Sequence, residues 1–173
     1  MYGSTCRRIY QVLLHLQNIT IPTVKEFIMS SNYAQKPAQG EKSLSKLLCT
    51  LRATLNPETF VFLTFLRGTP PPTSLDIQMA FREAEGQTII TTQSSAISHS
   101  FEYMFPCRMI TLDVHSSLEA VGFIAAVSAR LTEANIGVNP VSGYFHDHLF
   151  VSVGREEDAL RILGKMTEEA KAS

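Results

Sequence analysis

The loop before Gly122 is the part of the sequence whose residues are best placed to bind a small charged molecule. It reads HSSLEAV over residues 115–121 and leads into a segment with helical periodicity. The first amide groups of a helix have no partner within it, and the helix dipole places a partial positive charge there. A carboxylate could therefore bind the amides of Gly122, Phe123 and Ile124, where the missing Cβ of Gly122 permits close approach.

The same loop also fits a purely structural role. Ser116 and Glu119 have the spacing of a capping box, in which each side chain bonds the other's backbone amide. If the helix begins at Ser117 in this way, its first amides are already bonded and Gly122 lies inside the helix. The sequence leaves both interpretations open.

Other groups that could do chemistry lack the residues they would need around them. His146 and His148 could face the same side of a strand, but a metal needs three or four ligands and no further histidine lies at a supporting spacing. We therefore interpret this segment as a hairpin turn. Ser116 and Ser117 lack a nucleophile elbow, and Cys107 lacks an evident activating neighbour. The sequence predicts no enzyme, no metal centre and no cofactor.

The elements around the loop follow the order strand, helix, strand, strand, helix. Alternating apolar residues predict a strand over 110–114, two further apolar runs occupy 138–144 and 149–153, and a last helix begins at Glu156. The apolar stripe of the first helix comprises Val121, Ile124, Ala125, Ser128 and Leu131, and that of the last helix comprises Ala159, Ile162, Leu163, Met166 and Ala170. This order is typical of the split βαβ, or ferredoxin-like, fold.

The residues of this half resemble the ACT domain. The strings GFIAAV at 122–127 and ANIGVN at 134–139 are similar to the start of the ACT helix and of the strand that follows it. The strings HSSLEAVG and YFHDHLF resemble a family of small stand-alone tandem ACT proteins, which is related to the ACT modules of aspartate kinases and arginine sensors. The resemblance covers about residues 56–166 and is specific in the second half.

This resemblance implies an α+β fold of tandem ACT-like, ferredoxin-like (βαββαβ) modules with antiparallel sheets and helices on one face. It implies a non-catalytic sensor that holds an amino acid at the module interface and acts on a partner metabolic enzyme or within a homo-oligomer. The residues expected to line the ligand site are His115, Ser116, Ser117, Glu119, Val121, Gly122, Phe123, Ile124, Val138, Asn139, Ser142 and Gly143. Asn139 replaces an acidic residue of the lysine-sensing aspartate kinases, so lysine is disfavoured as the ligand.

The resemblance also suggests a setting for the sensor. A related stand-alone ACT protein accompanies a loline-type alkaloid pathway of fungi, so amino-acid metabolism or the synthesis of an amino-acid-derived alkaloid is expected. The alternative is a scaffold that uses ACT sheets for dimerisation and binds no ligand.

The first half should form a degenerate copy of the same module. Leucines spaced three and four apart predict a helix over 43–55 that Asn56-Pro57 ends. The other predicted elements are strands at 60–66, 77–82 and 88–92, a stiff proline-rich connection at 68–73 and a short helix at 93–98. The second module lacks the last strand of a full unit. We expect a strand of the first half or of another subunit to replace it, with 101–105 as the candidate.

Composition limits the partners and the location. The net charge of −1 does not indicate nucleic acid or an anionic membrane, and no apolar run reaches the roughly 18 residues of a membrane span. Three cysteines without a pattern favour a reducing, cytoplasmic location. The predicted organisation is a poorly ordered N-terminal extension (1–42), a degenerate ACT-like module (43–103) and an ACT domain (104–173). Residues 1–28 are either an upstream extension before a start at Met29 or a packed helix.

Overall fold

Residues 39–173 are described by the computed structural model, and the predictions for the N-terminal extension before residue 39 lie outside this range. The described part contains four helices and six strands. In chain order they are α3 (Leu44–Thr50), β1 (Ala53–Leu66), β2 (Ile77–Arg82), β3 (Gly86–Thr92), α4 (Gln93–Ser98), β4 (Met104–Leu112), α5 (Phe123–Glu133), β5 (Val138–Ser142), β6 (Asp147–Ser152) and α6 (Glu156–Ala172).

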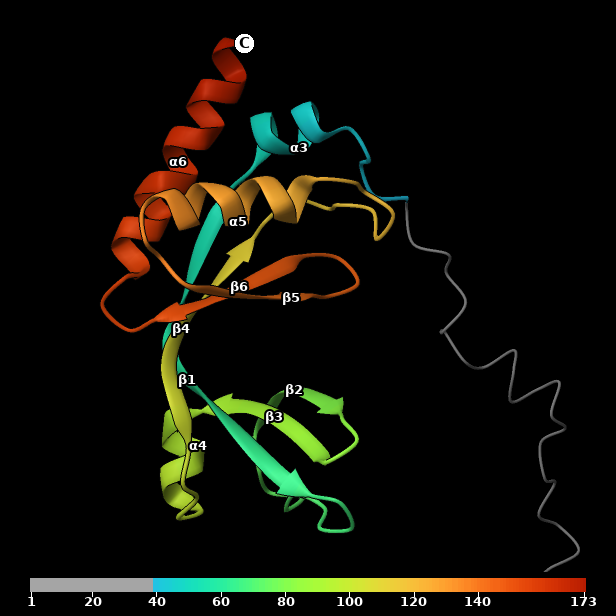
Figure 1. Ribbon diagram of the computed structural model, residues 1–173, viewed down its shortest axis with the longest axis vertical. Helices are drawn as coiled ribbons and strands as arrows, with labels where there is room; N and C mark the ends of the chain where they lie inside the picture. The colour runs from blue at the N-terminus through green and yellow to red at the C-terminus, as the bar shows by residue number, and fades with distance from the viewer. Residues whose placement is uncertain (1–38) are drawn as a thin grey trace, which may run out of the picture. The chain divides into compact units, whose positions relative to one another are not determined.

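The six strands form one antiparallel sheet in the order β2-β3-β1-β4-β6-β5. This sheet contains the ferredoxin-like strand order twice, because β1 and β4 each serve both modules. The start of β1 pairs with the end of β4 (Ala53 opposite Leu112), and the rest of β1 pairs with β3 and with the start of β4 (Phe62 opposite Met104). Figure 1 shows these two strands running from one module into the other.

The start of β1 therefore supplies the strand that the second module lacks. The expectation that the first half would fill this place is confirmed, but the candidate segment 101–105 is wrong. Only Met104 and Phe105 lie in a strand, at the start of β4, and they pair in the first module. The long β1 makes this possible, since its 14 residues reach across both modules.

The helices cover one face of the sheet. In the second module α3, α5 and α6 pack on β4 and β6, and the main core includes Ile110, Leu112, Leu149 and Leu163. In the first module the short α4 packs over Val61, Leu63 and Ile89. The two cores lie on the same face of the sheet. Phe60 and its strand partner Cys107 point to the face opposite Ile110, and Val61, the neighbour of Phe60, therefore points to the same face as Ile110.

The other face carries an aromatic cluster that no helix of the described part covers. The rings of Phe60 and Phe62 each meet the ring of Phe150 edge to face, with centroids 5.8 Å apart. Met79 of β2 and Val141 of β5 both pack against this cluster although they lie on opposite edges of the sheet. The sheet is therefore bent so that its two outer hairpins close over the aromatic rings.

Most predicted elements are present, but the predicted helix over 43–55 is too long. Helix α3 ends at Thr50, and β1 continues through Asn56-Pro57 with a register shift between Leu55 and Thr59. The bulge accommodates the proline, because a bulged residue needs no ladder hydrogen bond. Leu55 was assigned to the helical stripe because it repeats the leucine spacing, and it packs on the same core from the strand.

The apolar stripe of α5 is also shifted from its predicted phase. The buried side chains are Phe123, Val127 and Leu131, whereas Val121 precedes the helix and is 85% exposed. The stripe of α6 is correct, with Ala159, Ile162, Leu163 and Met166 buried. The predicted stripe was counted from Val121, but α5 begins only at Phe123, so its buried face is set by Phe123, Val127 and Leu131.

Candidate functional site

The loop from β4 to α5 lies at one end of the second module, beside the turn of the β5–β6 hairpin. The pairing shows this directly, because Leu112 at the end of β4 is opposite Asp147, and Asp147 is opposite Ser142. The structure thus brings Ser142 and Gly143 to the loop of residues 113–122. These are two of the residues that the sequence assigned to the site.

Helix α5 begins at Phe123, directly after Gly122. Gly122 has a φ of +90°, in the left-handed region that glycine adopts at little cost, and no side chain caps the helix. The amide of Ala126 donates to the Gly122 carbonyl at 2.9 Å. Within residues 39–173, no acceptor bonds the amides of Gly122, Phe123 and Ile124. These amides are the donors that could bind an anion.

The capping box is absent, and that interpretation of the loop is wrong. Ser116 is buried and its hydroxyl donates to the Asp147 carboxylate at 3.0 Å. The exposed Glu119 carboxylate forms an ion pair with Lys42, which lowers the pKa of Glu119. Neither side chain bonds the amides of the helix, because the helix begins at Phe123 and not at Ser117, where a capping box of Ser116 and Glu119 would start it.

The segment before α3 covers the first part of the loop. The Ser117 amide donates to the Glu41 carbonyl and the Glu41 amide donates to the His115 carbonyl, both at 2.9 Å. Gly40 lies so close that an added Cβ would be 2.4 Å from the Ser117 nitrogen. The backbone of residues 115–117 is therefore engaged within the chain, whereas the amides of Gly122, Phe123 and Ile124 at the start of α5 have no acceptor among residues 39–173.

The hairpin beside the loop contributes Asp147 and two histidines. Asp147 is buried and accepts hydrogen bonds from the hydroxyls of Ser116 and Ser142. His146 lies 3.2 Å through Nδ1 from the Val114 carbonyl, and His148 lies 3.0 Å through Nδ1 from the Thr111 hydroxyl. Burial lowers the pKa of His148, and the neighbouring His146 adds to this effect.

No group of three potential metal ligands occurs among residues 39–173. The hairpin was correctly predicted, although β6 already begins at Asp147 within the expected turn.

Val138 and Asn139 lie away from the other predicted site residues. Val138 is opposite Val151, which is opposite Arg108, so these residues occupy the far end of β5. Ser142 lies four residues after Val138 along the strand, which corresponds to roughly 13 Å. One small ligand at the α5 N-terminus does not reach both ends of the strand within a single chain.

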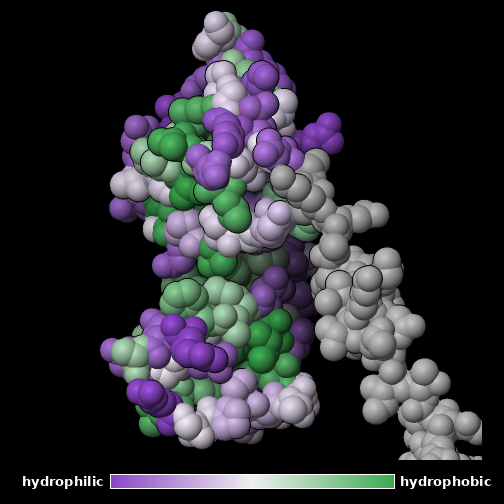
Figure 2. Space-filling model, turned by 90° about the vertical axis from the view of Figure 1, so that its right-hand side faces the viewer, coloured by the Kyte–Doolittle hydropathy of each residue, from purple (hydrophilic) through white to green (hydrophobic). Residues whose placement is uncertain are grey.

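Exposed apolar side chains surround the candidate site. Val121, Leu118, Tyr144 and Phe145 are between 52% and 85% exposed. The ring of Phe145 lies 5.5 Å from that of His115 and 5.0 Å from that of Tyr144, centroid to centroid. Figure 2 views the side on which the loop and the hairpin project, where hydrophobic areas alternate with hydrophilic ones.

Several residues of this site could not be identified from the sequence. Asp147 was noticed only as part of a possible metal motif, and Lys42 was assigned to the extension. Leu44 was assigned to the helix stripe, and its Cδ2 would lie 3.5 Å from a Cβ at position 122. The serine-rich loop and the acidic residue between two histidines were the available signals, but nothing local joined them.

Two sequence profiles of the ACT domain match the chain, one over residues 39–108 and the other over residues 104–165. None of the curated proteins compared with the chain matches it. The two matched ranges overlap at the start of β4, one of the two strands that both modules share.

Solved structures share the fold. A Vibrio cholerae protein of unknown function, described as a possible transport protein, is 36% identical, with a TM-score of 0.66 over 73% of this chain and 97% of its own. An Agrobacterium tumefaciens protein is 15% identical, with a TM-score of 0.59 over 68% of this chain and 89% of its own. The ligand-free regulatory subunit of aspartate kinase from Thermus thermophilus is 10% identical, with a TM-score of 0.51 over 66% of this chain and 95% of its own.

Proposed function

We propose, from the premise that this chain belongs to the family of tandem ACT-domain proteins, that it is a non-catalytic sensor of a free amino acid. The family points to regulation through ligand binding. The amino acid would bind at the β4–α5 loop of the second module, and its occupancy would be passed to a partner enzyme or to another copy of the chain.

The observation that carries this proposal is the row of unbonded amides at the start of α5. The amides of Gly122, Phe123 and Ile124 have no acceptor among the described residues, and a carboxylate is the group of an amino acid that such donors bind. The missing side chain at Gly122 leaves room for its approach. Ser142 and Gly143 lie at the same end and would contact the rest of the ligand.

The remaining predicted residues would take different roles in such a site. His115, Ser116 and Ser117 would shape the loop. The His115 carbonyl and the Ser117 amide bond the backbone of Glu41, and the Ser116 amide donates to the Val114 carbonyl. Val121 would lie beside the ligand and Glu119 would attract its ammonium group, in competition with Lys42. Val138 and Asn139 would take part only from a second copy, since they lie at the far end of β5.

The alternative is an ACT scaffold that dimerises without a ligand. It is favoured by the exposed Val121, Leu118, Tyr144 and Phe145, since apolar side chains gathered on a surface suit contact with another protein. For the sensor we expect a role in amino-acid metabolism or in the synthesis of an amino-acid-derived alkaloid. Within residues 39–173 no helix is long and apolar enough to span a membrane.

A thermal-shift screen against the twenty amino acids separates the two functions. A ligand at a hundred times its dissociation constant should stabilise the sensor by about 2.7 kcal/mol, whereas a scaffold should respond to none. The Gly122→Ala variant should lose the response. Its matched control is Gly154→Ala, because Gly154 also has a left-handed φ, of +86°, and an added Cβ at position 154 would have no atom within 4 Å.

The control separates loss of the site from strain. Both substitutions place a Cβ on left-handed backbone and should lower the melting temperature similarly. Gly154→Ala should keep the full ligand response. If Gly122→Ala responds as strongly as Gly154→Ala, the ligand binds elsewhere. If no amino acid stabilises the wild-type chain, the scaffold function holds instead.

A further inference from the structure

The first module contains a cavity at its own outer end. Its volume is about 550 Å³, and it lies between the turn after β1 and the hairpin that joins β2 to β3. This volume is within the range of small-molecule sites in proteins, roughly 300–1,000 Å³. The cavity occupies the place in the first module that corresponds to the candidate amino-acid site in the second, since each follows the first strand of its module and faces a hairpin turn.

Two glycines hold the walls of this cavity in place. The Thr69 amide donates to the Leu66 carbonyl at 3.0 Å, and Gly68 has a φ of +88°, as the third residue of a type II turn requires. Gly86 lies against β1 so closely that an added Cβ would be 2.1 Å from the Phe65 carbonyl oxygen. The backbone conformation of each wall therefore requires glycine, at position 68 in the turn and at position 86 in the hairpin.

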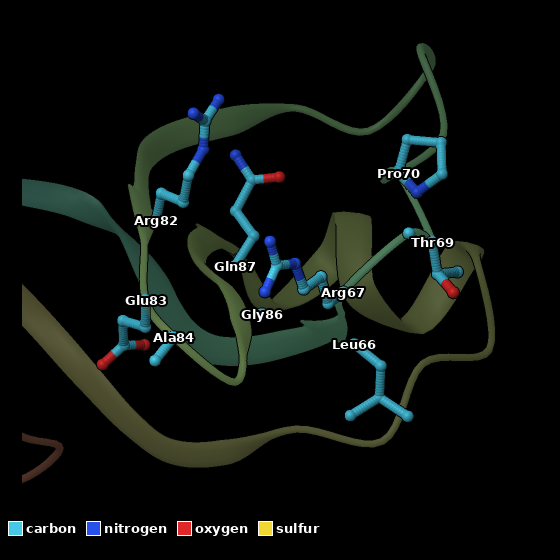
Figure 3. Close-up of a pocket in the computed structure, with 10 residues that line it drawn as sticks. Leu66, Arg67, Thr69, Pro70, Arg82, Glu83, Ala84, Gly86 and Gln87 are labelled. Carbon is cyan, nitrogen blue, oxygen red and sulfur yellow. The ribbon is translucent and has the colours of Figure 1, made fainter.

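The side chains at the cavity are donors without partners. Arg67 follows β1 and Arg82 ends β2, and neither guanidinium has a hydrogen bond or an ion pair with any residue from 39 to 173. The amide of Gln87 lies between them. In Figure 3 the Arg82 and Gln87 side chains extend upward, and the Arg67 side chain extends across toward Gln87.

One carboxylate also lines the cavity, but it is turned away from the guanidinium groups. Glu83 accepts a hydrogen bond from the Thr88 hydroxyl, and its side chain points away from Arg67 and Arg82 in Figure 3. Leu66 and Pro70 also line the cavity, but the 72% exposed Leu66 side chain points away from the guanidinium groups in Figure 3. The cavity thus combines two guanidinium groups that have no partner among residues 39–173, an amide and the apolar ring of Pro70.

We propose that this cavity binds a small organic oxyanion, with its phosphate or carboxylate group held by Arg67 and Arg82 and its apolar part against Pro70. Planar guanidinium groups bind such oxyanions through paired hydrogen bonds. The first module binds its ligand through side-chain charges, whereas the second module offers backbone amides. The site is independent of the proposed amino-acid site and would give the chain a second input.

The test is an NMR titration of the ¹⁵N-labelled full chain at low ionic strength with inorganic phosphate, phenyl phosphate and succinate as separate probes. At least one probe should shift the amide signals of Gly68, Thr69, Gly86 and Gln87 in a saturable manner. Phenyl phosphate should bind more tightly than inorganic phosphate, because its ring packs against Pro70. The Arg67→Gln/Arg82→Gln double variant should weaken binding roughly tenfold or more.

A matched control separates a built site from general attraction to positive charge. Arg52 is also exposed, has no ion pair among the described residues and lies outside the cavity, so Arg52→Gln should bind the probe as the wild type does. All three arginines are exposed, and the variants should keep the wild-type circular dichroism spectrum. The proposal is overturned if no probe saturates, or if Arg52→Gln weakens binding as much as the double variant does. The Gly122→Ala variant should leave this titration unchanged, so the two sites fail or succeed separately.

Discussion

The hydroxyl of Ser116 donates a hydrogen bond of 3.0 Å to the carboxylate of Asp147, which joins the β4–α5 loop to the first residue of β6. Both side chains are buried, and a second hydroxyl, from Ser142, donates to the other carboxylate oxygen. Among the described residues no cation pairs with Asp147. Hydrogen bonds therefore stabilise this buried charge, and they fix the course of the loop that leads to α5.

Replacing Ser116 with alanine should lower the free energy of unfolding by about 1.5–3 kcal/mol, the usual contribution of a hydrogen bond to a charged group. The measurement is urea denaturation followed by circular dichroism. Ser94→Ala is the control, because the Ser94 hydroxyl is exposed and contacts only the Thr92 hydroxyl. The control should change stability by no more than about 0.5 kcal/mol. Equal effects of the two substitutions would contradict a special role for the Ser116–Asp147 bond.

The phase of α5 gives a second prediction. Leu131 is fully buried, so Leu131→Ala should cost about 2–5 kcal/mol through lost contacts and a cavity. Val121, which the sequence placed on the same stripe, is 85% exposed, and Val121→Ala should change stability by no more than about 0.5 kcal/mol. Denaturation of both variants measures the difference. A large loss for Val121→Ala would mean that another protein or copy covers this residue.

The sequence could predict elements whose signal is local. The alternating residues of 77–82 and the short helix of 93–98 were predicted with the observed bounds, because each pattern is complete within its own segment. The end of α3 was not predicted, because a leucine repeat does not show whether Leu55 belongs to a helix or to a strand. Both choices place Leu55 in the core, so burial alone could not distinguish them. The phase of α5 was not predicted either, because the helix begins only at Phe123.

The candidate site was predictable only in part, for a related reason. The loop and the start of α5 follow each other in the sequence, so their donors could be proposed together. The contacts that remove the capping box come from Lys42 and Asp147, which lie far from the loop in the sequence. The strand that completes the second module comes from β1, and its length through Asn56-Pro57 depends on a bulge that local patterns do not predict.

The glycines give a third prediction, in which two substitutions have opposite signs. Gly86→Ala should destabilise the chain by at least about 2 kcal/mol, because its Cβ would be 2.1 Å from the backbone carbonyl oxygen of Phe65. Gly164 lies exposed inside α6 with no atom within 4 Å of an added Cβ. Gly164→Ala should stabilise by about 0.5–1 kcal/mol through helix propensity. Thermal and urea denaturation measure both, and a stable Gly86→Ala variant would mean that β3 does not approach β1 as described.

The pH dependence of stability gives the last prediction. Burial lowers the pKa of His148 below its usual value of 6.5, the charge of His146 lowers it further, and the Asp147 carboxylate partly opposes both. Below pH 6.5 the unfolded chain therefore binds more protons than the folded chain at this residue. The contribution of the neutral ring is complete above pH 6.5 and is lost as the pH falls through the lowered pKa of the folded state.

The free energy of unfolding should accordingly decrease as the pH is lowered from about 6.5 to 5.5, measured by urea denaturation at each pH. His148→Gln keeps a polar side chain near the Thr111 hydroxyl but does not titrate, so its profile should be flatter over this interval. His99→Gln, in the first module, serves as the control and should keep the wild-type slope. Parallel profiles for His148→Gln and the wild type would show that another group causes the pH dependence, because a lowered pKa of the half-buried His148 requires the slopes to differ.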